Sequence, residues 1–563
     1  MNFFTEFALV IGLAAMLGIL ATKLKQPAIL GYIICGLLVA VFAPNFNEHK
    51  EQLDLLSKVG IVFLLFLLGL ELNPSELKKL GRVAFITGVG QIVFTFVIGL
   101  SITLILGFDL IPAMYISIGL TLSSTIIVVK ILSQKKELET LHGRISISFL
   151  LIQDMVAILL MTGLSATGKN IGGIDAIAEL GFTLIKGSLA VGAVILFMKF
   201  IFNYILDWIK NDREILFITV IAWVLGVAAF VSSVGLSIEI GALLAGIVLA
   251  QRYESLQIES WTRPLRDFFI TIFFVILGLE LNLTSVASQI EPALILSAFV
   301  LIGNPIIVMV LLGSLGYSSK VSFLTSLVVA QVSEFSLILV RFGTELNQIN
   351  SEILTLITLV AGITMVISSY TILYSENLYE LFKNQLKIFE FRHKELISEQ
   401  LMMKFDHEYE TILLGCHRMG RRFLAENTHK KADILVIDYD PDVVKELISE
   451  GYEAVYADLS DGGVYESLPW STAKTVVSTI PHIKDNNRIL HFVSTLSSRP
   501  VVIVTANDDA HARELYAAGA DFVIYPHLLG GNLITDIIAE GFLSKKYLDM
   551  KNKHMNQLIF HKR

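Results

Sequence analysis

Long apolar segments recur along the first two thirds of the chain, and they constrain its fold more than any other feature. Segments long enough to cross a bilayer lie near residues 5–22, 27–43, 58–72, 83–106, 110–133, 144–166, 180–208, 214–233, 236–250, 265–281, 292–316, 320–342 and 353–375. With 54% hydrophobic and 17% charged residues, the chain is too apolar for one soluble protein. We predict a polytopic all-α membrane domain over residues 1–376 with about thirteen transmembrane helices, the first retained rather than cleaved as a signal peptide.

Lysine and arginine collect in alternate loops of this domain. One set of loops contains most of them, including Lys23, Lys78, Lys135, Lys210, Arg252 and Lys320, whereas the other set offers little beyond Lys50 and Lys169. The basic side of a membrane protein is cytoplasmic. We therefore expect a multi-pass protein of the cytoplasmic membrane, with its N-terminus outside and its C-terminal part in the cytosol.

Two acids stand in the middle of apolar segments. They are Asp154 and Glu334, and an ionised side chain at the bilayer centre costs at least about 2.5–3.5 kcal/mol. Such residues usually face the protein interior and bind ions or protons. The alternative for Asp154 is a structural ion pair or helix-packing hydrogen bond, and Glu334 either joins the ion path or only neutralises helix ends. Glu71 and Glu280 stand at segment ends, where we expect a solvated interface.

The first half of the membrane domain recurs in the second half at an offset near 210 residues. Three matches support this: residues 69–73 with 278–282, Gly31 and Gly36 with Gly241 and Gly246, and Ser123-Ser124 with Ser333-Glu334. The copies begin seven segments apart, an odd number, so they insert with opposite topology. Inverted repeats place the substrate site near the midplane between broken helices. We predict breaks at residues 121–125 and 331–334, although small hydroxyl residues also serve close helix packing.

Five motifs in order resemble those of the Kef-type branch of the monovalent cation:proton antiporters. They are Leu122-Ser123-Ser124-Thr125, Gly143-Arg144, Gln153-Asp154, Gly241-Ala242-Leu243-Leu244-Ala245-Gly246 and Gln331-Val332-Ser333-Glu334-Phe335. The resemblance covers essentially the whole chain. It implies the antiporter fold, a homodimer, and an elevator-like movement of a core bundle against a dimerising bundle.

The same resemblance places the ion-binding aspartate at Asp154 and puts Gln153 beside it, as in potassium-transporting Kef proteins. Two positions depart from the family pattern. The chain has Val332-Ser333-Glu334 in place of Gly-Gly-Glu, and it has Asn304 where many relatives carry a lysine. Asn304 either helps the site or caps a helix beside Pro305.

A lone carboxylate in a semi-dry cavity holds a proton or a cation, because its empty charged form is penalised. One acid without a nearby lysine predicts electroneutral exchange of K⁺ or Na⁺ for H⁺, and Gln153 favours K⁺. The expected ion and proton site comprises Asp154, Gln153, Ser123, Ser124, Thr125, Glu334, Ser333 and Asn304. We expect no other metal site, no cofactor for transport and no catalytic residues.

Three other functions fit parts of the sequence. The first is a Na⁺/H⁺ antiporter of the same fold. The second is a nucleotide-gated cation channel, but the nearest string to a carbonyl filter, residues 87–90, lies inside a predicted helix. The third is a membrane oxidoreductase, which would need paired cysteines or haem-binding histidines in the apolar segments.

The rest of the chain predicts a soluble α/β unit. We expect a helical linker over 377–407, a Rossmann-like regulatory domain over 408–545 and a C-terminal tail over 546–563, with strands at 411–414, 434–438, 453–457, 475–479, 501–505 and 522–525. Such a tail resembles the domains that regulate potassium conductance and uptake, which bind nucleotides and dimerise. No nucleic-acid partner is expected.

A strand, a glycine turn, a helix and a second strand ending in an acid are typical of nucleotide-binding domains. Here His417 replaces the middle glycine of the fingerprint. The expected contacts of AMP, NAD or another adenine nucleotide are Gly415, His417, Arg418, Gly420, Asp438 and Asp458. The alternative is a scaffold that binds nothing. Because the tail contains no catalytic set for hydride transfer, we interpret it as a sensor.

Overall fold

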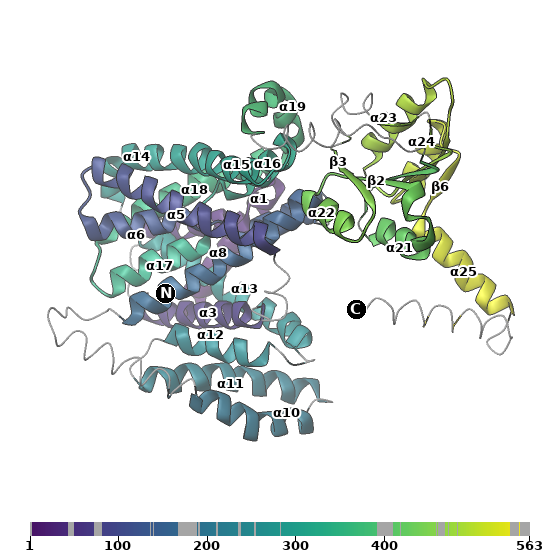
Figure 1. Ribbon diagram of the computed structural model, residues 1–563. Helices are drawn as coiled ribbons and strands as arrows, with labels where there is room; N and C mark the ends of the chain where they lie inside the picture. The colour runs from purple at the N-terminus through teal and green to yellow at the C-terminus, as the bar shows by residue number, and fades with distance from the viewer. Residues whose placement is uncertain are drawn as a thin grey trace. The chain divides into compact units, whose positions relative to one another are not determined.

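The computed structural model contains two compact units, whose helices and strands are drawn in Figure 1. The membrane unit comprises Met1–Leu315 and Ser319–Phe389, and the C-terminal unit comprises Gly316–Ser318 and Glu390–Arg563. The structure describes residues 3–42, 50–71, 81–166, 189–390, 409–540, 551 and 555, apart from gaps at 136, 139, 190–191, 210–211, 235–237, 251, 253–254, 282, 417, 458, 460–467, 471 and 481.

Eight segments of the described residues are helical, long enough and apolar enough to cross a membrane. They are Phe4–Lys23, Gln52–Leu70, Arg82–Ile105, Leu110–Gln134, Arg213–Ser233, Val286–Ser314, Ser319–Glu345 and Ser351–Leu373. Ala28–Phe42 and Ile240–Leu249 are shorter apolar helices. The polytopic all-α membrane domain is confirmed. The count of about thirteen crossings stays a prediction, since several expected segments extend beyond the described residues.

One group of helices packs together and is here called the scaffold bundle. Its members are α1 (Phe3–Lys23), α2 (Ala28–Phe42), α3 (Lys50–Glu71), η2 (Met198–Phe202), α10 (Asn203–Ile209), α11 (Arg213–Ser233), α12 (Ile238–Leu249) and α13 (Ser255–Leu279). Close backbone contacts lie between α2 and α13 and between α12 and α3. Each of these pairs joins a helix of the first repeat to a helix of the second.

Matched glycines make these contacts possible. A side chain on Gly36 in α2 would collide with the backbone of Val275 in α13, and one on Gly246 in α12 would collide with the backbone of Phe66 in α3. The absence of a side chain lets two helix backbones approach closely. The two glycines therefore play the same role in the two repeats, as their matched positions in the sequence predict.

The remaining membrane helices form a second group, here called the core bundle. Its members are α5 (Gly81–Ile105), α6 (Leu110–Thr121), α7 (Thr125–Gln134), α8 (Leu141–Ala166), α14 (Leu283–Ala298), the π-helical turn η3 (Phe299–Gly303), α15 (Asn304–Ser314), α16 (Ser319–Ser326), η4 (Leu327–Val329), α17 (Glu334–Glu345) and α18 (Ser351–Leu373). Two short helices follow it, α19 (Ser375–Leu386) and η5 (Lys387–Phe389). Both predicted helix breaks are present, between α6 and α7 and between η4 and α17.

The C-terminal unit contains a six-stranded parallel sheet in the order β3-β2-β1-β4-β5-β6. The strands are β1 (Thr411–Leu414), β2 (Ile434–Asp438), β3 (Glu453–Tyr456), β4 (Thr475–Ser478), β5 (Val501–Thr505) and β6 (Phe522–Ile524). The helices are α21 (Arg418–Glu426), η6 (Thr428–Asp433), α22 (Pro441–Ser449), α23 (Ile483–Ser494), α24 (Asp509–Ala517) and α25 (Pro526–Glu540). This order confirms the Rossmann-like fold, and its switch point lies between β1 and β4.

Candidate functional site

The two broken helices of the core bundle cross at their breaks. The backbone N–H of Ser333 donates to the carbonyl oxygen of Leu122 at 2.9 Å. The hydroxyl of Ser336 donates to the carbonyl oxygen of Gly119 at 2.7 Å. A break in an apolar helix frees backbone groups that need new partners. At this crossing, each broken helix supplies partners for the other.

Serine residues cap both helices that begin at the crossing. The Ser124 hydroxyl accepts a hydrogen bond from the Ile127 N–H at 3.3 Å, at the start of α7. The Ser333 hydroxyl accepts one from the Phe335 N–H at 3.1 Å, at the start of α17. The partial positive charge of a helix N-terminus favours an acid or another oxygen ligand nearby. The crossing therefore brings two such ends into one buried region.

The caps correct the alignment of the two repeats. Ser124 and Ser333 both directly precede a helix and both cap it, so they are structural counterparts. Thr125 then corresponds to Glu334. Matching Ser123-Ser124 with Ser333-Glu334, as the sequence comparison does, is wrong by one residue, because small residues flank both breaks and give no register of their own.

Asp154 lies on α8 and faces the protein interior, with only 4% of its surface exposed. The Thr125 hydroxyl, in the first turn of α7, donates to its Oδ2 atom at 2.9 Å. The central acid of the predicted site and the break in the first repeat are therefore in direct contact.

A chain of neutral polar side chains leads away from Gln153. The Gln153 amide nitrogen donates to Gln91 Oε1, and Gln91 Nε2 donates to the Thr95 hydroxyl at 3.1 Å. Thr95 in turn donates to Asn304 Oδ1 at 2.8 Å. All four side chains are buried. We call these four residues the amide chain. Sequence reasoning missed Gln91 and Thr95, although both are polar residues inside the apolar segment 83–106.

The amide chain also supports the end of α6. Asn304 Nδ2 donates to the carbonyl oxygen of Leu120 at 3.2 Å, and Gln91 Nε2 donates to that of Thr121 at 3.3 Å. Asn304 lies directly after the π-helical turn η3, and its backbone N–H donates to the Phe299 carbonyl oxygen. Its side chain therefore contacts Thr95 and the end of α6 and does not cap the helix beside Pro305.

Several buried oxygen atoms near the crossing have no hydrogen-bond partner among the described residues. They are Ser123 Oγ, Gln153 Oε1, and both carboxylate oxygens of Glu334. Glu334 is only 1% exposed and opens α17, where Ser124 and Ser333 are its polar neighbours and Arg266 acts on it through its charge. Buried polar atoms are normally satisfied, so each unsatisfied one calls for an explanation, such as a bound ion or water.

A cluster of ion pairs joins the core bundle to the scaffold bundle. Arg341 in α17 is 6% exposed and pairs with Asp54 in α3, with Glu280 at 3.7 Å and with Glu345 at 3.7 Å. Its guanidinium also lies 5.6 Å from the ring centre of Phe273. Glu280 is partly exposed, with 18% of its side-chain surface accessible, and it pairs with Arg341 at the end of its apolar segment. The side chain of Glu71 lies outside the described residues.

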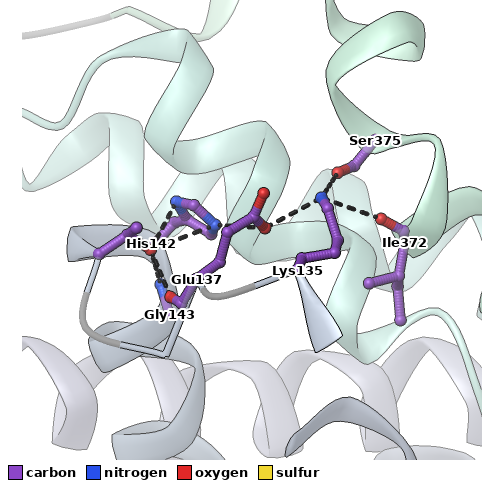
Figure 2. Close-up of polar contacts among 7 residues, drawn as sticks. Lys135, Glu137, His142, Gly143, Ile372 and Ser375 are labelled. Atoms are coloured by element: carbon purple, nitrogen blue, oxygen red, sulfur yellow. Dashed lines mark hydrogen bonds and ion pairs between the residues drawn. The ribbon is translucent and has the colours of Figure 1, made fainter. Parts of the chain in front are cut away.

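A second polar cluster joins the loop between α7 and α8 to the end of α18 (Figure 2). Lys135 Nζ lies 2.9 Å from Glu137 Oε2 and donates to the Ser375 hydroxyl at 2.9 Å and to the Ile372 carbonyl oxygen at 3.4 Å. His142 Nε2 lies 3.2 Å from Glu137. Burial alone would raise the pKa of Glu137, but the hydrogen bonds from His142 and Lys135 outweigh it and lower the pKa below its ordinary value.

In the C-terminal unit, Gly415, Gly420 and Asp438, three of the predicted nucleotide-binding residues, lie beside the switch point. Gly415 has a φ of +81°, and Gly420 packs against its carbonyl oxygen. Each oxygen of Asp438 accepts a backbone N–H, from Cys416 at 2.6 Å and from Asp440 at 2.9 Å. Burial raises the pKa of the Cys416 thiol to about 12, so it stays neutral.

The other three predicted nucleotide contacts are Arg418, His417 and Asp458. Arg418 begins α21, while His417 and Asp458 lie outside the described residues. Within the described part of the chain, no group of three histidine, cysteine or acidic residues could hold a metal ion.

Each of the two units matches a known protein family. Residues 10–373 match the family model described as sodium/hydrogen exchanger, transmembrane, and residues 411–526 match the TrkA-N domain. YbaL of Escherichia coli (strain K12), named for cation/proton antiport, is 25% identical over 91% of this chain and 93% of its own length. KefB of Alkalimonas amylolytica, named for K⁺ efflux antiport, is 23% identical over 98% of this chain and 83% of its own length.

Among solved structures, the sodium proton antiporter MjNhaP1 from Methanocaldococcus jannaschii is similar with a TM-score of 0.48 and 18% identity. The similarity covers 68% of this chain and 97% of that structure.

Proposed function

Because the chain belongs to the sodium/hydrogen exchanger family, we propose that it is a monovalent cation:proton antiporter that exchanges K⁺ for H⁺ at Asp154. The observation that carries the proposal is the buried contact between Asp154 and Thr125 at the helix break. Relatives named for cation/proton and K⁺ efflux antiport support the reaction class and favour K⁺. Na⁺ is the alternative cation, since the description of the family names sodium.

The unsatisfied oxygens supply the rest of the proposed ion shell. Gln153 Oε1, Ser123 Oγ and the Glu334 carboxylate are buried without a hydrogen-bond partner among the described residues. Leaving a buried polar group unsatisfied costs about 1–3 kcal/mol. A monovalent cation in this region offers these oxygens a partner, and a proton on Asp154 neutralises the charge when the cation has left. Ser124 and Ser333 hold the helix ends around it.

The neutral amide at Asn304 is the basis for proposing electroneutral exchange. A lysine at this position would add a second proton-binding group, whereas Asn304 reaches the end of α6 with an uncharged N–H. The carbonyl end of a helix carries partial negative charge, and a donor there compensates it. One carboxylate then exchanges one cation for one proton, and no net charge moves.

The division into bundles supports an elevator-like movement of the core bundle against the scaffold bundle. We further propose that the protein is a homodimer in the cytoplasmic membrane, with its N-terminus outside. The C-terminal unit lies in the cytosol and regulates exchange by binding AMP, NAD or another adenine nucleotide through Gly415, Gly420 and Asp438, with Arg418, His417 and Asp458 as further contacts. A bound nucleotide alters exchange only if it prefers one arrangement of the protein.

Transport by full-length protein in proteoliposomes tests the exchange. An imposed K⁺ gradient should drive protons in the opposite direction, read from a trapped pH dye, and the rate should not depend on an imposed membrane potential. Asp154→Asn should abolish the signal because the variant cannot alternate between charged and neutral forms. Asp109→Asn is the matched control, since Asp109 is exposed and makes no capping hydrogen bond. Undiminished exchange by Asp154→Asn would end the assignment. Repeating the assay with Na⁺, Li⁺ and Rb⁺ identifies the preferred cation.

A further inference from the structure

The side-chain amides of Asn304 and Gln91 have fixed orientations, because each donates a hydrogen bond to a backbone carbonyl oxygen. The Leu120 and Thr121 oxygens can only accept hydrogen bonds. Asn304 must therefore turn its NH₂ group toward Leu120, and Gln91 must turn its NH₂ group toward Thr121. The oxygen and nitrogen of a side-chain amide are assigned from such partners, and these partners leave one choice for each amide.

The orientation of the Gln91 amide determines the orientation of the Gln153 amide. Once the Gln91 NH₂ group is committed to Thr121 and Thr95, the oxygen of Gln91 faces Gln153. Two amide oxygens cannot hydrogen-bond to each other, so Gln153 must present its NH₂ group to Gln91. The oxygen of Gln153 is then turned away from the amide chain, and it is buried without a hydrogen-bond partner among the described residues.

We propose that Gln91 is a positioning residue that determines cation affinity and selectivity by fixing the orientation of the Gln153 amide. The inference rests on the proposed exchange at Asp154. With Gln91 in place, Gln153 offers the cation an oxygen. Without it, the amide can rotate by half a turn and offer an NH₂ group, which repels a cation. The effect falls on cation binding, since the carboxylate that binds the proton is a different group.

The buried position of Gln91 supports a specific role. It lies in α5, where it is fully buried and accepts a hydrogen bond from Gln153, the neighbour of Asp154 in α8. A buried glutamine in an apolar helix needs partners for both ends of its amide. Gln91 has partners at both ends, and they belong to three different elements: α5 itself, the end of α6 and α8.

Exchange kinetics of Gln91→Met test the inference. This substitution keeps the length of the side chain and removes both ends of the amide. The apparent KM for K⁺ should rise about tenfold, as expected for losing one oxygen contact to a charge. The ratio of KM values for K⁺ and Na⁺ should move toward one. The maximal rate at saturating K⁺ should stay within about twofold of the wild-type rate.

Thr103→Val is the matched control. Thr103 lies in the same helix and is equally buried, but its hydroxyl contacts Gly99 and Leu100 in its own helix and Ser117 in α6, none of which belongs to the amide chain. Its KM for K⁺ should equal the wild-type value. If Gln91→Met yields no folded protein, Gln91→Asn replaces it. Asparagine keeps the amide but is one methylene too short to reach both partners, so the same rise in KM is expected.

A double-mutant cycle separates positioning from a general effect on folding. Gln153→Leu should raise the KM for K⁺ to a similar extent, and adding Gln91→Met to it should change the KM no further. A further rise in the double variant would show that Gln91 acts by another route and would overturn the proposal. If the wild-type protein exchanges cations but Gln91→Met keeps its KM and selectivity, this inference alone fails. If the wild-type protein does not exchange at all, the proposed function fails.

Discussion

Glu137 and Asp154 are held in different ways, and the difference suits different roles. Glu137 contacts a lysine and a histidine, which favour its charged form, and it joins a loop to the end of α18. Asp154 takes a hydrogen bond from the neutral hydroxyl of Thr125. A hydroxyl can rotate when a cation enters, so the hydrogen bond from Thr125 is compatible with exchange at Asp154. We expect Glu137 to be structural and Asp154 to be exchangeable.

The lowered pKa of Glu137 predicts a pH-dependent contribution to stability. Its contribution is fully present above the ordinary glutamate value of 4.5 and is lost as the pH falls through the lower pKa of the folded state. Glu137→Gln should therefore lower the melting temperature of the solubilised protein at pH 7 by a few °C, equivalent to about 1–2 kcal/mol. At an acid pH below the lowered pKa of Glu137, the variant and the wild type should melt together.

Differential scanning fluorimetry of the full-length protein in detergent would measure this difference. Glu352→Gln, at the exposed start of α18, provides the matched control. A difference between Glu137→Gln and wild type that is the same at both pH values would show that charge on Glu137 contributes nothing.

Among the helices, the two repeats make matching close backbone contacts in the scaffold bundle, at Gly36 in α2 and at Gly246 in α12. Gly246 in α12 lies against Phe66 and Gly69 in α3, so Gly246→Ala forces the helices apart. We expect overpacking to cost about 1–3 kcal/mol and to lower the melting temperature. Gly226→Ala in the neighbouring α11 is the control, because among the described residues no heavy atom beyond the local helix backbone lies within 4 Å of the added methyl group. It should be neutral or stabilising, since alanine favours helix by about 1 kcal/mol. Equal melting temperatures for the two variants would contradict this packing.

Local patterns predicted the strands of the C-terminal unit well. The bounds of β1, β2 and β5 agree with the predicted segments 411–414, 434–438 and 501–505, because turn residues delimit short buried runs. The two helix breaks were also predicted, since hydroxyl residues interrupt apolar runs at matching places. These features depend on neighbours in sequence, and a sequence pattern contains that information.

Contacts between remote segments could not be predicted in the same way. Thr95 meets Asn304 and Asp54 meets Arg341 only because the helices pack as they do. Nothing in the residues around Asn304 indicates the π-helical turn that precedes it. The sequence predicted Thr125 beside Asp154, and the two side chains are in contact, but it indicated neither Gln91 nor Thr95 as a neighbour of the expected ion site. The role of Asp154 in ion binding stays a prediction.

Taken as a whole, the molecule combines a membrane unit and a nucleotide-binding fold, and the proposed coupling of the two is open to a separate test. Full-length protein should bind AMP or NAD in a calorimetric titration. Asp438→Asn should weaken binding, because it removes the charge that a ribose hydroxyl would meet and keeps an acceptor for only one of the two backbone N–H groups, of Cys416 and Asp440, that Asp438 binds. Asp442→Asn, exposed on α22, should bind as the wild type does. No affinity for any adenine nucleotide would remove the sensor proposal and leave the exchange proposal standing.

The central claim is that one carboxylate binds a cation and a proton in turn, and proton release on cation binding tests it most directly. Full-length protein in weakly buffered detergent solution would be titrated with KCl and, separately, with choline chloride at equal ionic strength. We predict that K⁺ releases protons saturably, approaching about one per chain at a pH where Asp154 is protonated, and that choline releases none. In Asp154→Asn the release should vanish. Proton release that persists in Asp154→Asn, or K⁺ binding by the wild type with no release at any pH, would contradict the account.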